Sequence, residues 1–254
     1  MEVVGFSPAG ERSMDAQADM KAEPIHRRLQ YISSYTGKLL RQKFGRGPEA
    51  CFAFAGGPFL LIEIGGFVTP MEEALFRQGQ SIAVDTVRQA IMTGILEELK
   101  GVIQSMLELE VRMMFHDWNF PNNSGLIAAA LDRELPTEAP KTPSFEPDYR
   151  LVEHEVSRLS ALVQKVPEEV RTYRINERFC VVIRRGILVP IEKALIAKGY
   201  EQELLNTKDD LEKTYFHRDG TFSDLFRAPV ADIFLDWSFP NDLGFICFVL
   251  ESRR

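Results

Sequence analysis

Two copies of an Asp-Trp pair are the clearest candidates for chemistry in this sequence. Asp117-Trp118 and Asp236-Trp237 lie 119 positions apart, and each precedes a Pro-containing loop. If two units of the chain pack about a pseudo-twofold axis, the four side chains could line a shared pocket. A structural role is the simpler interpretation, because Asp residues often cap turns and a Trp can cover a sheet edge. Spacing alone leaves both interpretations open.

Arginines supply the other candidates for binding. Arg88, on a predicted long helix, is a further candidate for the shared pocket. Arg46 lies in the run Gly45-Arg46-Gly47-Pro48, which could offer backbone N–H groups and positive charge to an anion, although a helix C-cap is the simpler interpretation. Another cluster lies on one predicted hairpin and suits an acidic partner, an anionic membrane surface or a nucleotide, or else guards an exposed sheet edge: Arg171, Arg174, Arg178, Arg184 and Arg185.

Metal-binding and catalytic signatures are missing from the sequence. His116 lies beside Asp117, but no second His has a recognisable ligand spacing, so we expect no metal. Cys51, Cys180 and Cys247 are far apart among apolar residues and are expected to be reduced core residues. Because no nucleophile elbow, P-loop or dinucleotide fingerprint is present, we predict no catalytic residue and no cofactor.

The candidate residues belong to an internal repeat. Residues 59–75 align without gaps with residues 179–195 at an offset of 120, and residues 117–126 align with 236–245 at an offset of 119. Two blocks in the same order and at nearly equal separation indicate a duplication. We predict a flexible tail at residues 1–23, a first unit at 24–132, a linker at 133–147 and a divergent second unit at 148–254.

Each unit is predicted to contain a helix, a β-hairpin, two helices and a second β-hairpin. The fold class is therefore α+β, with antiparallel sheets packed as a pseudo-dimer. In the first unit we expect helices at 24–44, 70–79 and 81–107, the last one bent near Gly101, and strands at 49–55, 59–67, 110–118 and 125–131. In the second unit we expect helices at 148–165, from 190 onward and at 201–215, and strands at 170–175, 178–187, 230–237 and 244–251.

The strands of the first hairpins are apolar almost throughout. Continuous rather than alternating hydrophobicity suggests that helices cover one face of each sheet and the sister unit the other. Glu63 interrupts the apolar run of residues 59–64 and is expected at an exposed edge.

A known family shares these features. They are the Gly45–Pro48 run, the apolar hairpin, the segment from Phe67 to Leu75, the helix with Arg88 and the closing Asp-containing hairpin. Together they resemble the MpsC-like family of small bacterial cytoplasmic proteins. The resemblance covers about residues 25–131 well and 150–251 more loosely, and the second unit has Val166-Pro167-Glu168 in place of the Gly-Arg-Gly-Pro run and no recognised equivalent of Arg88.

The resemblance implies a role beside a membrane. The family is named for a component of a sodium-translocating, membrane-potential-generating system linked to inorganic carbon uptake. Membership would imply a non-enzymatic cytoplasmic accessory or regulatory protein, peripheral to the inner face of the membrane, whose partner is the cytoplasmic face of a cation or bicarbonate transporter. The alternative is a small-molecule or anion-binding sensor, or an enzyme, with a site between the two units; a deep polar pocket there would favour it.

The composition argues against one class of partner. The formal net charge is −7 and the sequence pI about 5.3, so nucleic acid is not an expected partner. No apolar stretch reaches the roughly 18 residues of a spanning helix, and no signal peptide is recognised, so we expect a cytoplasmic chain without a transmembrane segment. Because two units can pair within one chain, we expect a monomer or a weak homodimer.

Overall fold

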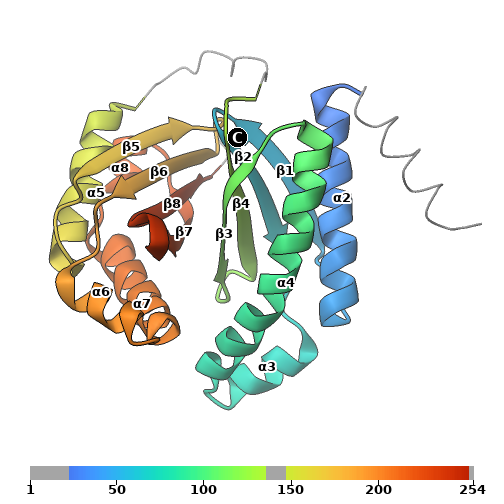
Figure 1. Ribbon diagram of the computed structural model, residues 1–254, viewed down its shortest axis with the longest axis horizontal. Coiled ribbons are helices and arrows are strands. Elements are labelled where there is room, and N and C mark those ends of the chain that lie inside the picture. Colours follow the sequence, from blue (N-terminus) through green and yellow to red (C-terminus); the bar gives the residue numbers. More distant parts are fainter. Residues whose placement is uncertain (1–22, 136–146, 252–254) are drawn as a thin grey trace, which may run out of the picture.

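The computed structural model describes residues 23–135 and 147–251 (Figure 1). The predicted tail lies outside these ranges except for its last residue, as does most of the predicted linker. The first repeat consists of α2 (Ile25–Phe44), β1 (Ala50–Gly56), β2 (Phe59–Gly65), α3 (Pro70–Arg77), α4 (Ser81–Leu107), β3 (Val111–Asn119) and β4 (Ser124–Leu131). The second consists of α5 (Tyr149–Val163), β5 (Glu169–Arg174), β6 (Phe179–Arg185), α6 (Pro190–Ala197), α7 (Glu201–Asp219), α8 (Phe222–Phe226), β7 (Val230–Ser238), the 3-10 helix η1 (Phe239–Asn241) and β8 (Leu243–Leu250).

Each repeat forms a four-stranded antiparallel sheet with the same strand order. The orders are β1-β2-β4-β3 and β5-β6-β8-β7, so the second hairpin pairs with the inner strand of the first. Both sheets have a register irregularity at the start of the third strand in chain order, between Val111 and Met113 and between Val230 and Asp232. The predicted α+β fold, with the same elements repeated, is confirmed.

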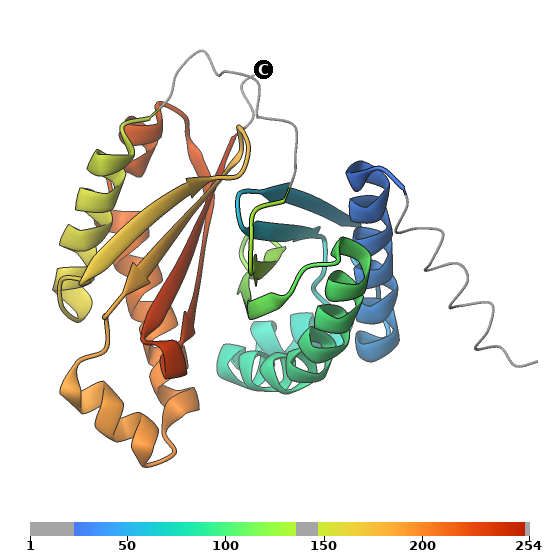
Figure 2. The same cartoon turned by 45° about the horizontal axis from the view of Figure 1, so that its top comes forward.

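The two sheets face each other, and the helices cover their outer faces. Figure 2 shows both sheets between the helices of the two repeats. One core cluster lies between each sheet and its helices, and a third cluster of residues from both sheets fills the space between them. In this third cluster Phe115 of β3 stacks on Phe245 of β8 with ring centroids 4.7 Å apart. The apolar strands are therefore covered on both faces, as the sequence indicated.

One glycine permits the sheets to approach closely. A Cβ atom added to Gly56, at the end of β1, would lie 2.5 Å from the carbonyl oxygen of Ile175, just after β5. That separation is shorter than any van der Waals contact, so a side chain at residue 56 would force the two hairpins apart.

The α3 helix begins as its sequence predicts. The Thr69 hydroxyl accepts a hydrogen bond from the Glu72 N–H at 3.3 Å, and the Glu72 carboxylate accepts one from the Thr69 N–H at 2.7 Å. This capping box satisfies two backbone donors that a helix start otherwise leaves unpaired. Pro70 occupies the first turn, where its missing N–H costs nothing.

The long helix differs between the repeats. The α4 helix continues through Gly101 to Leu107, whereas the matching stretch of the second repeat breaks at Gly220 into α7 and α8. Gly220 is extended, and a Cβ atom there would lie 2.5 Å from the Phe216 carbonyl oxygen. Gly101, near which a bend was predicted, thus lies within an unbroken helix, and the break occurs at Gly220, where no bend was predicted.

Candidate functional site

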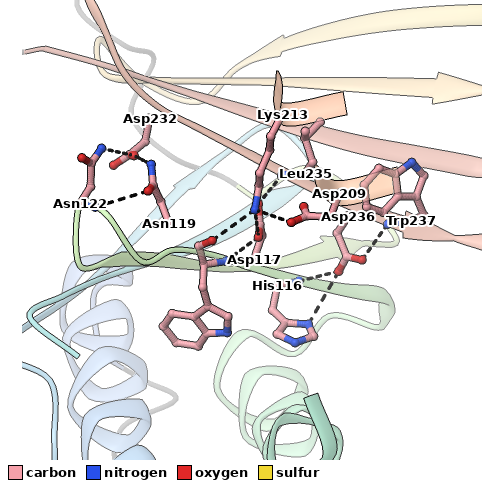
Figure 3. Close-up of polar contacts among 11 residues, drawn as sticks. His116, Asp117, Asn119, Asn122, Asp209, Lys213, Asp232, Leu235, Asp236 and Trp237 are labelled. Atoms are coloured by element: carbon pink, nitrogen blue, oxygen red, sulfur yellow. Dashed lines mark hydrogen bonds and ion pairs between the residues drawn. The ribbon is translucent and has the colours of Figure 1, made fainter. Parts of the chain in front are cut away.

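The repeated Asp residues connect the two repeats. Edge strands β3 and β7 lie next to each other, and each Asp accepts a hydrogen bond from the backbone of the opposite strand (Figure 3). Asp117 Oδ2 accepts from the Leu235 N–H, and Asp236 Oδ2 accepts from the His116 N–H, both at 2.7 Å. The other oxygen of each Asp accepts from the N–H of its own Trp neighbour, at 2.6 and 2.7 Å. These four bonds form a reciprocal clamp with pseudo-twofold symmetry.

The two Trp side chains lie on the opposite face of each edge strand, toward the helices. Trp118 packs across Gly125, where a Cβ atom would lie 2.1 Å from the indole, and the Arg88 guanidinium carbon is 4.3 Å from its ring centroid. Trp237 has the Lys208 ammonium 5.4 Å from its ring centroid. A cation therefore lies over the indole of both repeats.

Arg88 is a buried positioning group for the start of α3. Its guanidinium donates to both Glu72 oxygens at 2.9 and 2.8 Å, and to the Phe67 carbonyl at 2.7 Å. Lys208 takes this place in the second repeat: its Nζ donates to Glu192 Oε1 at 3.0 Å, while Glu192 accepts from the Val189 N–H. The statement that the second unit has no equivalent of Arg88 is therefore wrong, because an ammonium replaces the guanidinium.

A lysine on α7 breaks the symmetry of the clamp. Lys213 Nζ donates to Asp117 Oδ1 at 2.6 Å, to Asp209 Oδ2 at 2.9 Å and to the Trp118 carbonyl at 3.2 Å. The matching positions of the first repeat are the uncharged Thr93 and Gln89. Asp236 instead has the His116 imidazole 3.7 Å away. One Asp of the clamp is thus paired with an ammonium and the other with an imidazole.

A second polar contact between the repeats has no symmetric counterpart. Asp232 of β7 accepts hydrogen bonds from Asn119 at the end of β3 at 2.5 Å, from Asn122 in the following turn at 2.7 Å and from Ser124 at the start of β4 at 2.9 Å. Met113 stands at the position of the first repeat that matches Asp232. The turn of the first repeat is therefore tied to the second repeat, but not the reverse.

These residues surround a cavity of about 660 Å³ between the repeats. Residues of α4, β3 and its following turn, α7 and β7 line it. The structure thus brings together five residues that the sequence suggested for a shared pocket, and these are Arg88, Asp117, Trp118, Asp236 and Trp237. We call this space the inter-repeat cavity.

Burial shifts the protonation of several acids around the inter-repeat cavity. Burial raises the pKa of Asp236 to about 7, and burial together with nearby carboxylates raises that of Asp85 to about 6. Burial and the charge of Asp117 raise the pKa of Asp209 to about 8, against the opposing effect of Lys213. Burial lowers the pKa of His116 to about 4, so its contact with Asp236 involves a neutral imidazole at pH 7.

Some of the charged side chains that line the inter-repeat cavity are paired with opposite charges, and others are not. Arg88 forms an ion pair with Glu72, and Lys213 contacts the carboxyl groups of Asp117 and Asp209. Asp85 and Asp210 line the same space without an ion pair to a lysine or arginine among residues 23–135 and 147–251. Within those ranges no three His, Cys, Asp or Glu side chains are grouped as metal ligands.

Comparison with known families decides the affiliation. A family model described as the Na⁺-translocating membrane potential-generating system (MpsC) matches residues 26–133 and 154–252. The chain belongs to the MpsC family. The two matched segments correspond to the two structural repeats, which we therefore call the MpsC repeats. No curated protein and no solved structure matches the chain.

No helix within residues 23–135 and 147–251 is long and apolar enough to span a bilayer.

Arg46 lies away from the inter-repeat cavity. Its guanidinium donates to the Val68 carbonyl at 2.7 Å and lies 3.4 Å from a Glu49 oxygen. Gly45 ends α2 in the left-handed conformation, with φ of 74°. The C-cap interpretation of this run is confirmed, because a left-handed residue after a helix end is the position that favours glycine.

The arginine-rich hairpin splits into buried and exposed members. Arg184 is 0% exposed and forms an ion pair with Glu212 at 2.6 Å, so its expected place on the surface is wrong. Arg178 forms a two-bond ion pair with Glu63 of the first MpsC repeat, at 3.0 and 2.8 Å. The exposed members are Arg171 and Arg185, which contact Glu169, and the partly buried Arg174 donates to the Asn176 carbonyl.

Glu63 also differs from its expected position. It lies on β2, an interior strand between β1 and β4, with Phe52 and Leu126 as register partners. The exposed-edge interpretation is wrong, and the pairing with Arg178 explains why a carboxylate is tolerated within an apolar strand.

Sequence reasoning missed the residues of α7 and β7 that complete the site: Lys208, Asp209, Lys213 and Asp232. None has an identical counterpart in the first MpsC repeat, so self-comparison does not reveal them. One signal was present: Asp209 and Lys213 are four residues apart, which places them on one face of a helix.

Proposed function

We propose that the chain is a non-enzymatic accessory or regulatory component of a membrane-potential-generating system. The observation that carries this proposal is the family match over both MpsC repeats. In this proposal the chain works in the cytoplasm, peripheral to the inner face of the membrane, and its partner is the cytoplasmic face of the ion-translocating subunits. The transported species, a cation or bicarbonate, follows from the resemblance of the sequence to the family.

The side-chain chemistry supports a role without covalent catalysis. Burial raises the pKa of Cys51 to about 12 and those of Cys180 and Cys247 further, so none supplies a thiolate at neutral pH. The pKa of Lys213 is also raised, because its two carboxylate neighbours outweigh burial. Lys213 therefore remains an ammonium and does not provide a free amine nucleophile.

Affinity capture from the native host tests this proposal. The tagged full-length chain is incubated with detergent-solubilised membranes, and the captured proteins are identified by mass spectrometry. We expect the membrane subunits of the ion-translocating system to be enriched. A strain that lacks those subunits serves as the control, and repeated absence of any membrane transporter from the wild-type capture would contradict the proposal.

The inter-repeat cavity favours a second candidate function, a sensor of a small polar molecule. Its volume of about 660 Å³ falls in the range of small-molecule sites. Both MpsC repeats contribute to its walls, so a ligand that fills it would alter how the repeats are held together. This property is what a regulatory site requires.

Thermal-shift screening of small charged molecules tests the sensor function. We expect a ligand to raise the midpoint of unfolding of the wild-type chain and to have little effect on Asp210→Asn, which changes the cavity wall without removing a side-chain ion pair. Asp224→Asn, an exposed change on α8, is the matched control and should respond like the wild type. Equal responses of all three chains would place the ligand elsewhere.

A further inference from the structure

Two smaller cavities flank the inter-sheet core, and matching positions line them. In the first MpsC repeat these positions are Ala50, Phe52, Glu63, Gly65 and Ser124, and in the second they are Glu169, Arg171, Ile183, Arg185 and Leu243. The same strand positions therefore border a cavity in each repeat, but residues of the first repeat alone line one cavity and residues of both repeats line the other. We call the second one, with a volume of about 260 Å³, the arginine pocket.

The arginine pocket combines a basic rim with an apolar floor. Arg112 comes from β3 of the first repeat, while Arg171 and Arg185 come from β5 and β6 of the second. Glu169 is the only acid among the lining residues, which gives three positive charges against one negative. This local excess occurs in a chain whose net charge is −7. The floor consists mainly of Phe59, Met113, Ile183 and Leu243.

Glu169 holds two of the guanidiniums side by side. Its Oε1 forms an ion pair with Arg171 Nε, and its Oε2 lies 3.7 Å from Arg185 Nε. The closest contact of each of these arginines with Glu169 is through its Nε atom, and Arg171 also has a side-chain hydrogen bond with Tyr173. Arg112 has no ion pair to any acid within residues 23–135 and 147–251. The pocket thus presents guanidinium donors from both repeats.

Protection of the sheet edge does not account for these charges. β1 occupies the same edge of the sister sheet, and its sequence from Ala50 to Gly56 contains no charged residue, while Phe52 on it is 57% exposed. Arg112 is on β3, which is an edge strand of the first sheet and not of the sheet that contains β5. Its counterpart is Ala231, and that of Arg185 is Gly65. The fold therefore forms both spaces without requiring arginine in either.

We propose that the arginine pocket binds a phosphate monoester. A phosphate monoester carries a charge of about −1.5 to −2 at neutral pH, which matches the excess of two positive charges, whereas a carboxylate supplies only one. Guanidinium groups donate paired hydrogen bonds to phosphate oxygens. The apolar floor accommodates the organic part of the ester, and the small volume restricts that part to a few atoms inside the pocket.

Calorimetric titration of the full-length chain with phenyl phosphate tests the proposal, with inorganic phosphate as a probe without an apolar part. We expect the wild type to bind phenyl phosphate more tightly than inorganic phosphate. Arg112→Gln should weaken binding about tenfold, because it removes one charged donor and breaks no ion pair. Arg150→Gln changes an exposed arginine on α5, remote from the pocket, and should bind like the wild type.

Flotation with vesicles distinguishes the source of the phosphate. Binding to phosphatidic acid in phosphatidylcholine vesicles, lost in Arg112→Gln, would identify a lipid headgroup, whereas binding to phenyl phosphate alone would identify a free metabolite. The proposal is overturned if the wild type binds neither probe, or if Arg112→Gln binds as well as the wild type. If the wild type binds neither and Arg171→Gln aggregates, the arginines protect the edge.

Discussion

The two MpsC repeats enclose cores of the same shape but different chemistry. Ile64 and Met92 are buried in the apolar core of the first repeat, where the second repeat has Arg184 and Glu212 in an ion pair. Lys208 extends this pair, because its Nζ lies 3.5 Å from Glu212 and 3.0 Å from Glu192. The difference teaches that one backbone accepts either apolar packing or charge at these positions, provided that opposite charges arrive together.

Breaking the buried pair should have the largest effect. Arg184→Ala leaves Glu212 in the core with only the more distant Lys208, and we expect a loss of about 3 to 5 kcal/mol in the free energy of unfolding. The double variant Arg184→Ile with Glu212→Met gives the second repeat the residues of the first. Its free energy of unfolding should be within about 1 kcal/mol of the wild-type value or above it. Urea denaturation followed by circular dichroism measures both, and a double variant as unstable as the single one would contradict the equivalence of the two cores.

The reciprocal clamp should be unequal in strength. Asp117→Ala removes the partner of Leu235 and also leaves Lys213 with one carboxyl partner, so we expect a loss of about 3 kcal/mol. Asp236→Ala removes the partners of two backbone N–H groups but strands no ammonium, and should cost about 2 kcal/mol. The same denaturation measurement compares them. Equal losses would mean that Lys213 adds nothing to the clamp.

Exchange of the cation over the indole should have a smaller effect. Arg88→Lys gives the first repeat the residue type of the second, but it loses the hydrogen bond to the Phe67 carbonyl. We expect the free energy of unfolding to fall by about 1 to 2 kcal/mol. Arg77→Lys on the exposed side of α3 is the control and should change stability by less than about 0.5 kcal/mol. If both variants match the wild type in chemical denaturation, the bidentate geometry of Arg88 is not needed.

The smallest expected effect is a pH dependence of the clamp. The pKa of Asp236 rises from 3.8 to about 7 on folding, so the folded chain binds more protons than the unfolded chain between these values. Its contribution to stability is therefore full at low pH and is lost as the pH rises through 7. From pH 6 to pH 8 this amounts to about 1 kcal/mol, or about 3 °C in the unfolding midpoint.

Thermal unfolding of wild type and Asp236→Asn at pH 6, 7 and 8 measures this dependence. Asp85 and Asp209 titrate in the same direction, with pKa values of about 6 and 8, so some dependence should persist in the variant. His116 acts in the opposite direction, because its pKa falls from 6.5 to about 4 on folding, and it is present in both chains. We expect the decline of the midpoint to be shallower in Asp236→Asn. An unchanged slope would show that Asp236 does not take up a proton in this range.

Much of the fold was predictable because its signals are local. The repeated blocks, the Thr69-Pro70 helix start and the apolar strands each depend on neighbouring residues and on burial of whole faces. The sequence suggested that Asp117 and Asp236 could line a shared pocket, because the pair recurs at one repeat position, but it favoured a turn-capping role for both. The break at Gly220 was not foreseen, since the matching Gly101 lies within an unbroken helix.

The remainder of the site depends on contacts between distant residues. Arg184 was predicted on the surface because its neighbours in the sequence give no indication of its partner Glu212, which lies on another element. Glu63 likewise finds its partner, Arg178, in the other repeat. Lys208 replaces Arg88 through shared charge rather than shared identity. Pairings of this kind are defined by the packed structure, and the pattern of a single sequence does not reveal them.

The inter-sheet core joins two faces that can acquire different substitutions during evolution. The two faces of a homodimer are encoded once, so every substitution appears on both sides together. Here each face is encoded separately, and the covalent connection keeps the effective concentration of each face for the other high, so pairing survives dilution. A lysine could therefore arise beside one Asp and a histidine beside the other without either copy having to recognise two kinds of partner.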